Sequence, residues 1–370
     1  MKVQRIVVLA VLSLALGALD LAAQRVNVKY MDRSGNLRED SGTVDAWSYS
    51  ELKLKVGRGE RVLTSNDIVD VSFLNPPDGF EAAANAHRKG EFNNAIGLCR
   101  EALDGRIKKS EEWAKEFYAF WTWDSLWHLG DRAEAKKVQT TFLAEYPKSQ
   151  FIPDIEIAEA ELDYALGTFV EAEGNFSTFR RQGVTRGYAR RYLLRAGAGQ
   201  VQCLIDTQRL DPAKAVIDEM RSLAQSDDDR TRLTLMDADI LVARQSFKQA
   251  KEIFDRVLAS ASLEKAPFAV AKASNGLGEC HYGLKESMAA IEAFSRTFAL
   301  FDEDPARDAD VGWAFWRFSN ACKQYAAAAE SDDDRRFWEA RGRTNRQRAA
   351  ELYRWTRGGQ EARREMGLGK

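Results

Sequence analysis

Residues 273–298 of this chain read ASNGLGECHYGLKESMAAIEAFSRTF. Ala290 comes five positions after a turn-like residue, and Phe294 follows it by four positions. A small alanine lets the backbones of two crossing helices approach closely. An aromatic residue one turn later lies on the same helix face, where it fills the gap to the next pair of helices. The stretch therefore predicts a helical hairpin that stacks against neighbours of the same kind.

The same alanine returns along the chain. Intervals of 40, 37, 43, 35 and 40 residues separate Ala95, Ala135, Ala172, Ala215, Ala250 and Ala290. This period is typical of a helical solenoid, in which each hairpin buries its apolar face only against the next. We predict a mainly α fold with an α-solenoid of about six to seven hairpins. The fourth repeat is the least regular, so its register could slip by two residues.

The repeats resemble the tetratricopeptide (TPR) family over residues 80 to 300. In the best match, Leu277-Gly278 occupies the Leu-Gly pair of the family's first helix, and Ala290 and Phe294 occupy positions of the second. The first unit carries Gly90-Glu91-Phe92-Asn93-Asn94-Ala95, close to the family's Gly-Asp-Tyr-x-x-Ala turn. The second carries Gly130-Asp131 and ends on Tyr146-Pro147. The resemblance implies TPR-like repeats over residues 80–306 that bind a protein partner.

In the TPR family, the first helix of each repeat lines a concave binding face. Transferred by register, the resemblance implies these partner-binding candidates: His87, Phe120, Asp124, Trp127, Ile157, Glu161, Tyr164, Asp239, Asn275, Glu279 and Tyr282. Such an acidic and aromatic surface would suit a peptide with basic and apolar residues. An error of one residue in the register rotates each position by about 100°.

A short β-like region, residues 24–74, precedes the helices. Hydrophobic and polar residues alternate in it with a period of two, which indicates short, half-buried strands. The pattern resembles small Sm-like and SH3-like barrels, and a structural or docking module is the role we expect. Residues 75–79, Asn-Pro-Pro-Asp-Gly, form the linker, because proline fits neither a central strand nor a helix interior.

The N-terminus reads as a secretory signal over residues 1–23. Lys2 and Arg5 precede an apolar run of 14 residues, Ile6 to Leu19, and Ala22-Ala23 offers a small-residue cleavage site. We therefore expect an exported protein, periplasmic or secreted, without a transmembrane anchor once the signal is removed. An uncleaved anchor is the alternative. The four cysteines are far apart and lack metal-binding spacing, so we expect buried free thiols.

The far end of the chain is basic. Residues 307–357 read as capping helices and residues 358–370 as a basic tail. From Arg335 to Lys370 there are 11 Lys/Arg against 4 Asp/Glu, whereas the whole chain of 370 residues carries a net charge of −2. The overall balance argues against nucleic-acid binding, which needs a surplus of cations. The basic end is either a solvated surface or a contact for an acidic partner or an anionic membrane.

Seven aromatic residues fall between Trp113 and Trp127: Trp113, Phe117, Tyr118, Phe120, Trp121, Trp123 and Trp127. Projected onto a helix they cover more than one face, which a single packing stripe does not require. Either this helix is buried on two sides, or some rings line a groove for a peptide or glycan. Exposure of Trp123 and Trp127 would favour glycan binding, and their burial would count against it.

No catalytic constellation is present in the sequence. The three histidines lie outside any zinc or nucleophile motif, and no phosphate-cradling loop occurs. Two Ser-Asp-Asp-Asp runs, at residues 226–229 and 331–334, read as helix caps rather than calcium loops. We expect a non-enzymatic interaction scaffold of the cell envelope without cofactor or metal. The alternatives are a glycan- or peptidoglycan-associated binder and a self-associating structural protein that forms a homo-oligomer.

Overall fold

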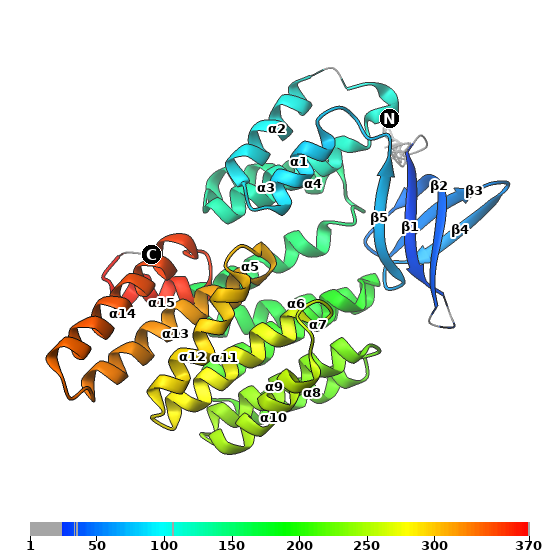
Figure 1. Ribbon diagram of the computed structural model, residues 1–370. Helices are drawn as coiled ribbons and strands as arrows, with labels where there is room; N and C mark the ends of the chain where they lie inside the picture. Colours follow the sequence, from blue (N-terminus) through cyan, green and yellow to red (C-terminus); the bar gives the residue numbers. More distant parts are fainter. Residues whose placement is uncertain (1–23, 33, 35, 106, 369–370) are drawn as a thin grey trace, which may run out of the picture.

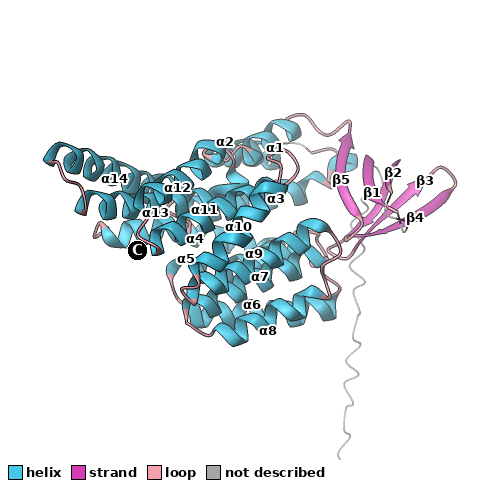
Figure 2. Cartoon of the chain, turned by 60° about the horizontal axis from the view of Figure 1, so that its bottom comes forward, coloured by secondary structure: helices cyan, strands magenta, loops and turns pink. Residues whose placement is uncertain are grey.

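The computed structural model describes residues 24–368 except 33, 35 and 106. The predicted signal peptide lies outside the described residues. Five strands come first: β1 (Arg25–Met31), β2 (Leu37–Trp47), β3 (Glu51–Val56), β4 (Gly59–Thr64) and β5 (Ile68–Leu74). They form one antiparallel sheet in the order β4-β3-β2-β1-β5, which projects from one side of the helical array (Figures 1 and 2). The predicted small all-β module is therefore present.

The sheet has a compact core of its own. Val26 and Val28 of β1, Val44 of β2, and Leu52 and Leu54 of β3 are buried together. They alternate with exposed residues, as the period of two predicts. β4 and β5 are the two edges of the described sheet. Trp47 and Phe73 lie at the side of this core that meets the helices.

Helices account for the rest of the described chain. They are α1 (Phe80–Arg88), α2 (Phe92–Asp104), α3 (Ala114–Leu129), α4 (Arg132–Glu145), α5 (Ile152–Leu166), α6 (Phe169–Arg186), α7 (Arg190–Asp206), α8 (Leu210–Arg221), α9 (Asp227–Ala243), α10 (Phe247–Ser260), α11 (Pro267–Gly283), α12 (Ser287–Phe301), α13 (Asp308–Ala327), α14 (Asp332–Leu352) and α15 (Arg357–Glu365). Two short 3-10 turns, Lys109–Glu111 and Pro305–Arg307, interrupt the connections. Among the described helices, none is long and apolar enough to cross a membrane.

Successive helices pair into hairpins, from α1–α2 to α13–α14, and the hairpins stack side by side. This array is the TPR-like α-solenoid that the repeats predict (Figure 1). The recurring alanines sit at the helix crossings, since Ala95, Ala135, Ala172, Ala250 and Ala290 are all fully buried. Their burial lets the paired backbones come close.

The fourth alanine corrects the sequence prediction. Ala213 is fully buried in the α7–α8 hairpin, whereas Ala215 is exposed. The register there is displaced by two residues, because Val216, Ile217 and Met220 set which face of α8 meets α7. The crossing also needs Gly197 of α7, since a Cβ atom at this glycine would lie 2.0 Å from the Met220 sulfur.

The array has two layers. Successive odd-numbered helices contact one another along much of the chain, for example α5 with α7 and α9 with α11. The even-numbered helices form the other layer. Contact between successive hairpins is loosest where α4 meets α5. We call the odd-numbered helices the inner layer, and all of the predicted binding residues lie on them.

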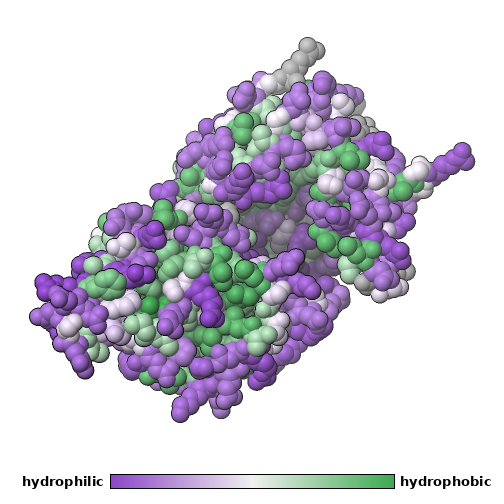
Figure 3. All heavy atoms as spheres, in the orientation of Figure 1, coloured by the Kyte–Doolittle hydropathy of each residue, from purple (hydrophilic) through white to green (hydrophobic). Residues whose placement is uncertain are grey.

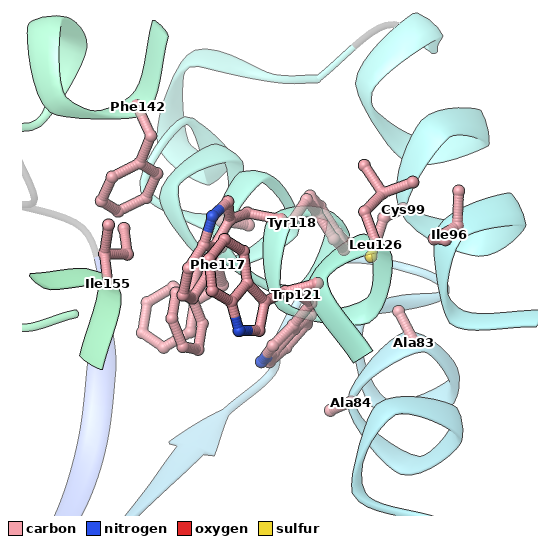
Figure 4. Close-up of a cluster of buried hydrophobic side chains, with 14 of the residues drawn as sticks. Ala83, Ala84, Ile96, Cys99, Phe117, Tyr118, Trp121, Leu126, Phe142 and Ile155 are labelled. Carbon is pink, nitrogen blue, oxygen red and sulfur yellow. The ribbon is translucent and has the colours of Figure 1, made fainter. Parts of the chain in front are cut away.

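The aromatic helix α3 is buried on two sides. Figure 4 shows Phe117 and Trp121 between Ala83 of α1 and Cys99 of α2 on one side and Ile155 of α5 on the other. The sheet covers a further face, where Trp47 and Phe73 pack on the same cluster. A helix that is apolar all round has to be enclosed in this way.

This burial decides between the two interpretations of the aromatic residues, in favour of a helix buried on two sides. Trp123 keeps 1% and Trp127 keeps 8% of its surface exposed. Sugar stacking needs an accessible ring face. Glycan binding through these tryptophans is therefore excluded as the role of this cluster, which instead fastens the first two hairpins to the sheet.

The C-terminal segment also differs from the prediction. Residues 358–370 were expected to form a basic tail, but α15 occupies this segment up to Glu365 and packs against α13, α14 and α5. Gly358, Gly359 and Ala362 are buried in this contact. The sequence pattern missed the helix because close backbone contact at glycines, rather than an apolar stripe, holds it.

Candidate functional site

The predicted binding residues lie on the inner layer, where several reach from one odd-numbered helix to the next. In the first such pair, His87 Nε2 of α1 lies 2.7 Å from Asp124 Oδ2 of α3. His128, one turn further along α3, lies 3.6 Å from the same carboxylate. Burial would raise the pKa of Asp124, but these histidines and Arg195 hold it below its usual value. The carboxylate is therefore ionised and already partnered.

A second pair joins α5 to α7. The Arg195 guanidinium donates from Nε and Nη2 to the two carboxylate oxygens of Glu161, at 2.6 and 2.7 Å. It also donates to Asp154 at 3.0 Å, and the Tyr192 hydroxyl donates to the other Asp154 oxygen at 2.7 Å. Burial opposes the charge of Arg195, but Glu161 and Asp154 raise its pKa. The paired side chains remain 37% and 45% exposed, so a partner can reach them.

A third pair joins α9 to α11. Lys272 Nζ lies 3.1 Å from Asp239, and Asp310 of α13 contributes a further negative charge nearby. Burial would lower the pKa of Lys272, but the two carboxylates raise it overall. Lys272 is therefore held as a cation between three neighbouring inner helices.

A fourth pair joins α11 to α13. Glu279 accepts hydrogen bonds from Arg317 Nε at 2.7 Å and from Trp313 Nε1 at 2.9 Å. The Arg317 guanidinium also lies 4.4 Å above the ring of Tyr282. Arg317 and Glu279 keep 15% and 19% of their side-chain surface exposed. The pair is thus largely enclosed, with Tyr282 beside it.

Four other candidates are packed inside the hairpins. Ile157 is fully buried, and Phe120 stacks on Phe151 with ring centroids 4.0 Å apart. Asn275 donates to the Asp310 carbonyl at 2.9 Å and accepts from Thr297 at 2.9 Å. Trp127 is buried beneath the Arg132 guanidinium, 4.0 Å from its ring. These residues support the inner layer and present little surface to a partner.

Tyr164 is intermediate in exposure between the paired residues and the residues packed inside the hairpins. It is half-buried on α5, 5.7 Å from the ring of Phe169. Burial and the nearby Asp206 carboxylate raise the pKa of its hydroxyl well above the usual value. The hydroxyl therefore remains protonated and can donate a hydrogen bond.

The sequence analysis did not predict the cations of these pairs, which are Arg195, Lys272 and Arg317. It also did not predict the nearby carboxylates Asp154 and Asp310. One sequence signal could have located these charged residues, because residues of opposite charge occupy facing positions on the first helices of successive hairpins. That signal needs a reliable register in α7 and α13, and these are the units in which the TPR resemblance is weakest.

One face of the molecule carries a hollow. Figure 3 shows a recess, lined largely by hydrophilic residues, between the first two hairpins, the sheet and the later hairpins. The charged pairs described above are surrounded densely enough to shift several pKa values, yet they keep some solvent contact. Such a combination is typical of the floor of a concave surface.

The described part of the chain contains no group of three His, Cys, Asp or Glu side chains suited to a metal ion. The Ser226 and Ser331 hydroxyls accept from backbone N–H groups three residues later, both at 3.0 Å, which confirms that the two Ser-Asp-Asp-Asp runs are helix caps. The four cysteines are buried and unpaired, and burial raises the pKa of each thiol to about 12.

No family model matches the chain, and no curated protein matches it. Solved structures with a similar arrangement of helices include a tetratricopeptide repeat protein from Parabacteroides merdae. That chain is 13% identical, and the match covers 72% of this chain and 97% of the other with a TM-score of 0.42. The assignment of a TPR-like fold rests on the stacked hairpins and buried crossing alanines themselves.

Proposed function

We propose that this chain is a non-enzymatic scaffold that holds a protein partner on the inner face of its TPR-like array. The row of polar pairs between successive odd-numbered helices carries the proposal. These pairs keep charges and hydrogen-bonding groups on the odd-numbered helices, with part of each side chain open to solvent. A solenoid commonly uses such an extended concave surface for binding.

The pairs also define the kind of partner. Glu161, Asp239 and Glu279 each have a cation from the neighbouring helix. A purely basic peptide would therefore have to displace Arg195, Lys272 or Arg317. A protein segment that carries charges of both signs can instead bind alongside the pairs, since it matches the alternation of charge along the inner face.

We also propose that the partner belongs to the cell envelope. The support is the N-terminal sequence, in which an apolar run between Arg5 and Asp20 is followed by small residues before Gln24. The mature chain should begin near Gln24. Intact mass measurement of protein purified from the envelope fraction tests this, and a chain that retains residues 1–23 would contradict cleavage.

The experiment is affinity capture of proteins from a native envelope fraction with the chain from residue 24 onward. The test variant is Glu161→Gln/Arg195→Gln, which removes both charges of an accessible pair while keeping similar shapes. Removing both members of a pair costs little stability compared with removing one. Asp154 keeps the hydrogen bond from Tyr192.

The matched control is Lys251→Gln/Asp255→Asn. This pair lies on α10 in the other layer, with its charged atoms 2.6 Å apart. We expect the test variant to lose about tenfold or more in affinity for the captured protein, as at a central interface position. Equal capture by the test variant, the control and the unchanged chain would show that the inner face is not the binding surface.

A further inference from the structure

The end of the chain returns to its beginning. Arg354 follows α14, and its Nη2 donates a 2.7 Å hydrogen bond to the carbonyl oxygen of Leu129, at the C-terminal end of α3. A carbonyl at this position has no partner within its helix, and the negative end of the helix dipole attracts a cation there. One arginine thus joins the last hairpin to the second.

The next residues extend this contact. The Trp355 ring lies edge-on to His128, with centroids 6.2 Å apart, and to Phe92 at 6.4 Å. The Arg357 guanidinium lies 4.5 Å above the ring of Phe169, at the start of α6. We call Arg354, Trp355 and Arg357 the clasp. It touches the turn ends of the first three hairpins, and α15, which follows it, packs against α5.

The helix that follows the clasp is fixed to the last hairpin. A Cβ atom at Gly358 would lie 2.3 Å from the Gly312 carbonyl oxygen of α13, and one at Gly359 would overlap the Tyr353 carbonyl oxygen. The Thr356 hydroxyl accepts from the Gly359 N–H at 3.1 Å and caps α15. Close backbone packing of this kind holds α15 on α13 and α14.

The contact of the clasp with the first hairpins is weaker. Arg354 is exposed, which limits the strength of its hydrogen bond. Arg357 Nε and Nη1 and Trp355 Nε1 are buried without a hydrogen-bond partner. Each unmet donor opposes the closed arrangement. One side of the clasp is therefore built to stay in place, and the other can be released.

The clasp spans the loosest junction of the array. Successive hairpins make close helix contacts except where α4 meets α5. On the opposite side of that junction, the sheet bridges it as well, because Trp47 packs on Phe117 and Ser65 accepts from Arg191 of α7 at 3.0 Å. The hollow of Figure 3 lies beside the sheet, and we expect its width to depend on both bridges.

We propose that the clasp is a releasable intramolecular contact that sets the width of the hollow and limits a partner's access to the inner face. This regulation rests on the proposed function, but the existence of the contact does not. When the clasp opens, α15 stays with the last hairpin. The first two hairpins then move away by pivoting at the contact between the sheet and α7.

The test of the clasp needs no partner. Hydrogen exchange of the chain from residue 24 onward is measured by mass spectrometry, together with the radius of gyration from small-angle X-ray scattering. In Arg354→Ala, we expect exchange at residues 129–131 to rise about fivefold, the loss of one net hydrogen bond. The radius of gyration should increase, and exchange in α13 should not change.

Arg343→Ala is the matched control, because Arg343 is an exposed arginine of α14 that pairs only within its helix. It should leave both measurements unchanged. Arg354→Lys keeps a cationic donor, so it should restore slow exchange at residues 129–131, which a general loss of folding would not allow. Exchange in Arg354→Ala equal to that in Arg343→Ala would overturn the clasp.

The gating role has a separate readout. With a captured partner in hand, Arg354→Ala should bind it about fivefold more tightly, because less of the chain is closed. Faster exchange without tighter binding would show that the clasp is only a brace. Failure of the inner-face variant to affect capture, with faster exchange still present, would remove the proposed binding face and leave the clasp itself standing.

Discussion

Two bridges hold the first hairpins of this protein, and they are built from opposite chemistry. At the sheet, Phe73 stacks on Trp113 with centroids 4.9 Å apart and lies edge-on to Phe80 and Phe117 at 5.2 and 5.1 Å. At the clasp, an exposed arginine reaches one backbone carbonyl. The first contact removes large apolar surfaces from water, whereas the second combines one charge-assisted hydrogen bond with a few contacts to single rings.

The two bridges therefore differ in how easily each one opens. Separating the interlocked aromatic rings exposes their buried surfaces together, which costs much free energy. A hydrogen bond at the surface costs little to open, since water replaces the partner. The sheet is therefore the fixed side of the hollow, and the clasp is the side that can respond to a partner.

Phe73→Ala should have the largest effect, because it removes the centre of the aromatic bridge. We expect a loss of about 3 kcal/mol in the free energy of unfolding, measured by denaturant titration. Val69→Ala, on the same strand but 57% exposed, is the control and should change it little. A loss no larger than the control's would mean that the sheet is only loosely attached.

Gly358→Ala tests the permanent side of the clasp. Its methyl group would meet the Gly312 carbonyl, and backbone cannot give way easily, so we expect a loss of about 2 kcal/mol. Gly174→Ala in α6 is the matched control, because a Cβ atom there meets nothing within 4 Å. The control should be neutral or stabilising, as alanine is the better helix former. Equal stability of the two variants would refute the close backbone packing.

Arg317→Ala tests whether the contact of Arg354 is weak because its side chain is exposed. This side chain is largely buried, and its loss leaves the Glu279 carboxylate without its cation. We expect a loss of about 1.5 kcal/mol, well above that of Arg354→Ala. If thermal unfolding shows the same small effect for both, exposure does not explain the weakness of the clasp.

A further effect should come from pH. Burial raises the pKa of Asp308 from 3.8 to about 7, with the nearby Trp355 of the clasp opposing the rise and Asp304 and Asp302 adding to it. The folded chain then binds this proton more tightly than the unfolded chain does. Its stabilising contribution is complete below about pH 4 and is lost as the pH rises through 7.

Asp308→Asn should therefore reduce the fall in melting temperature between pH 5 and pH 8 without abolishing it. Glu116 of α3, whose pKa burial also raises to about 7, would account for part of the remainder. Glu116→Gln/Asp308→Asn should flatten the profile further. A single variant with an unchanged slope would exclude Asp308 as a titrating group in this range.

The hairpin array could be predicted because its signals are local. Ala95 and Ala290 are buried where two helices that follow each other in sequence cross. The spacing of such residues along the chain is therefore enough to locate them. The register of α8 could not be predicted, since Val216 and Met220 choose between two alternatives through contacts with another helix. The burial of Trp123 depends likewise on how adjacent helices enclose α3.

The candidate site divides in the same way. Glu161 and Glu279 could be placed on first helices by register, but their pairing with Arg195 and Arg317 joins residues 34 and 38 positions apart. Ile157 was assigned to the same face, yet it packs into a hairpin core. A rotation of one residue separates the two outcomes.

By itself, the sequence determined the kind of architecture: alternating strands, then repeated hairpins, because periodicity and small crossing residues act over short distances. Only the tertiary structure decided that the array returns on itself, since Arg354 meets Leu129 across 225 residues. No local pattern encodes such a meeting, because it depends on the summed rotation from each hairpin to the next. The hollow and its clasp are products of that sum.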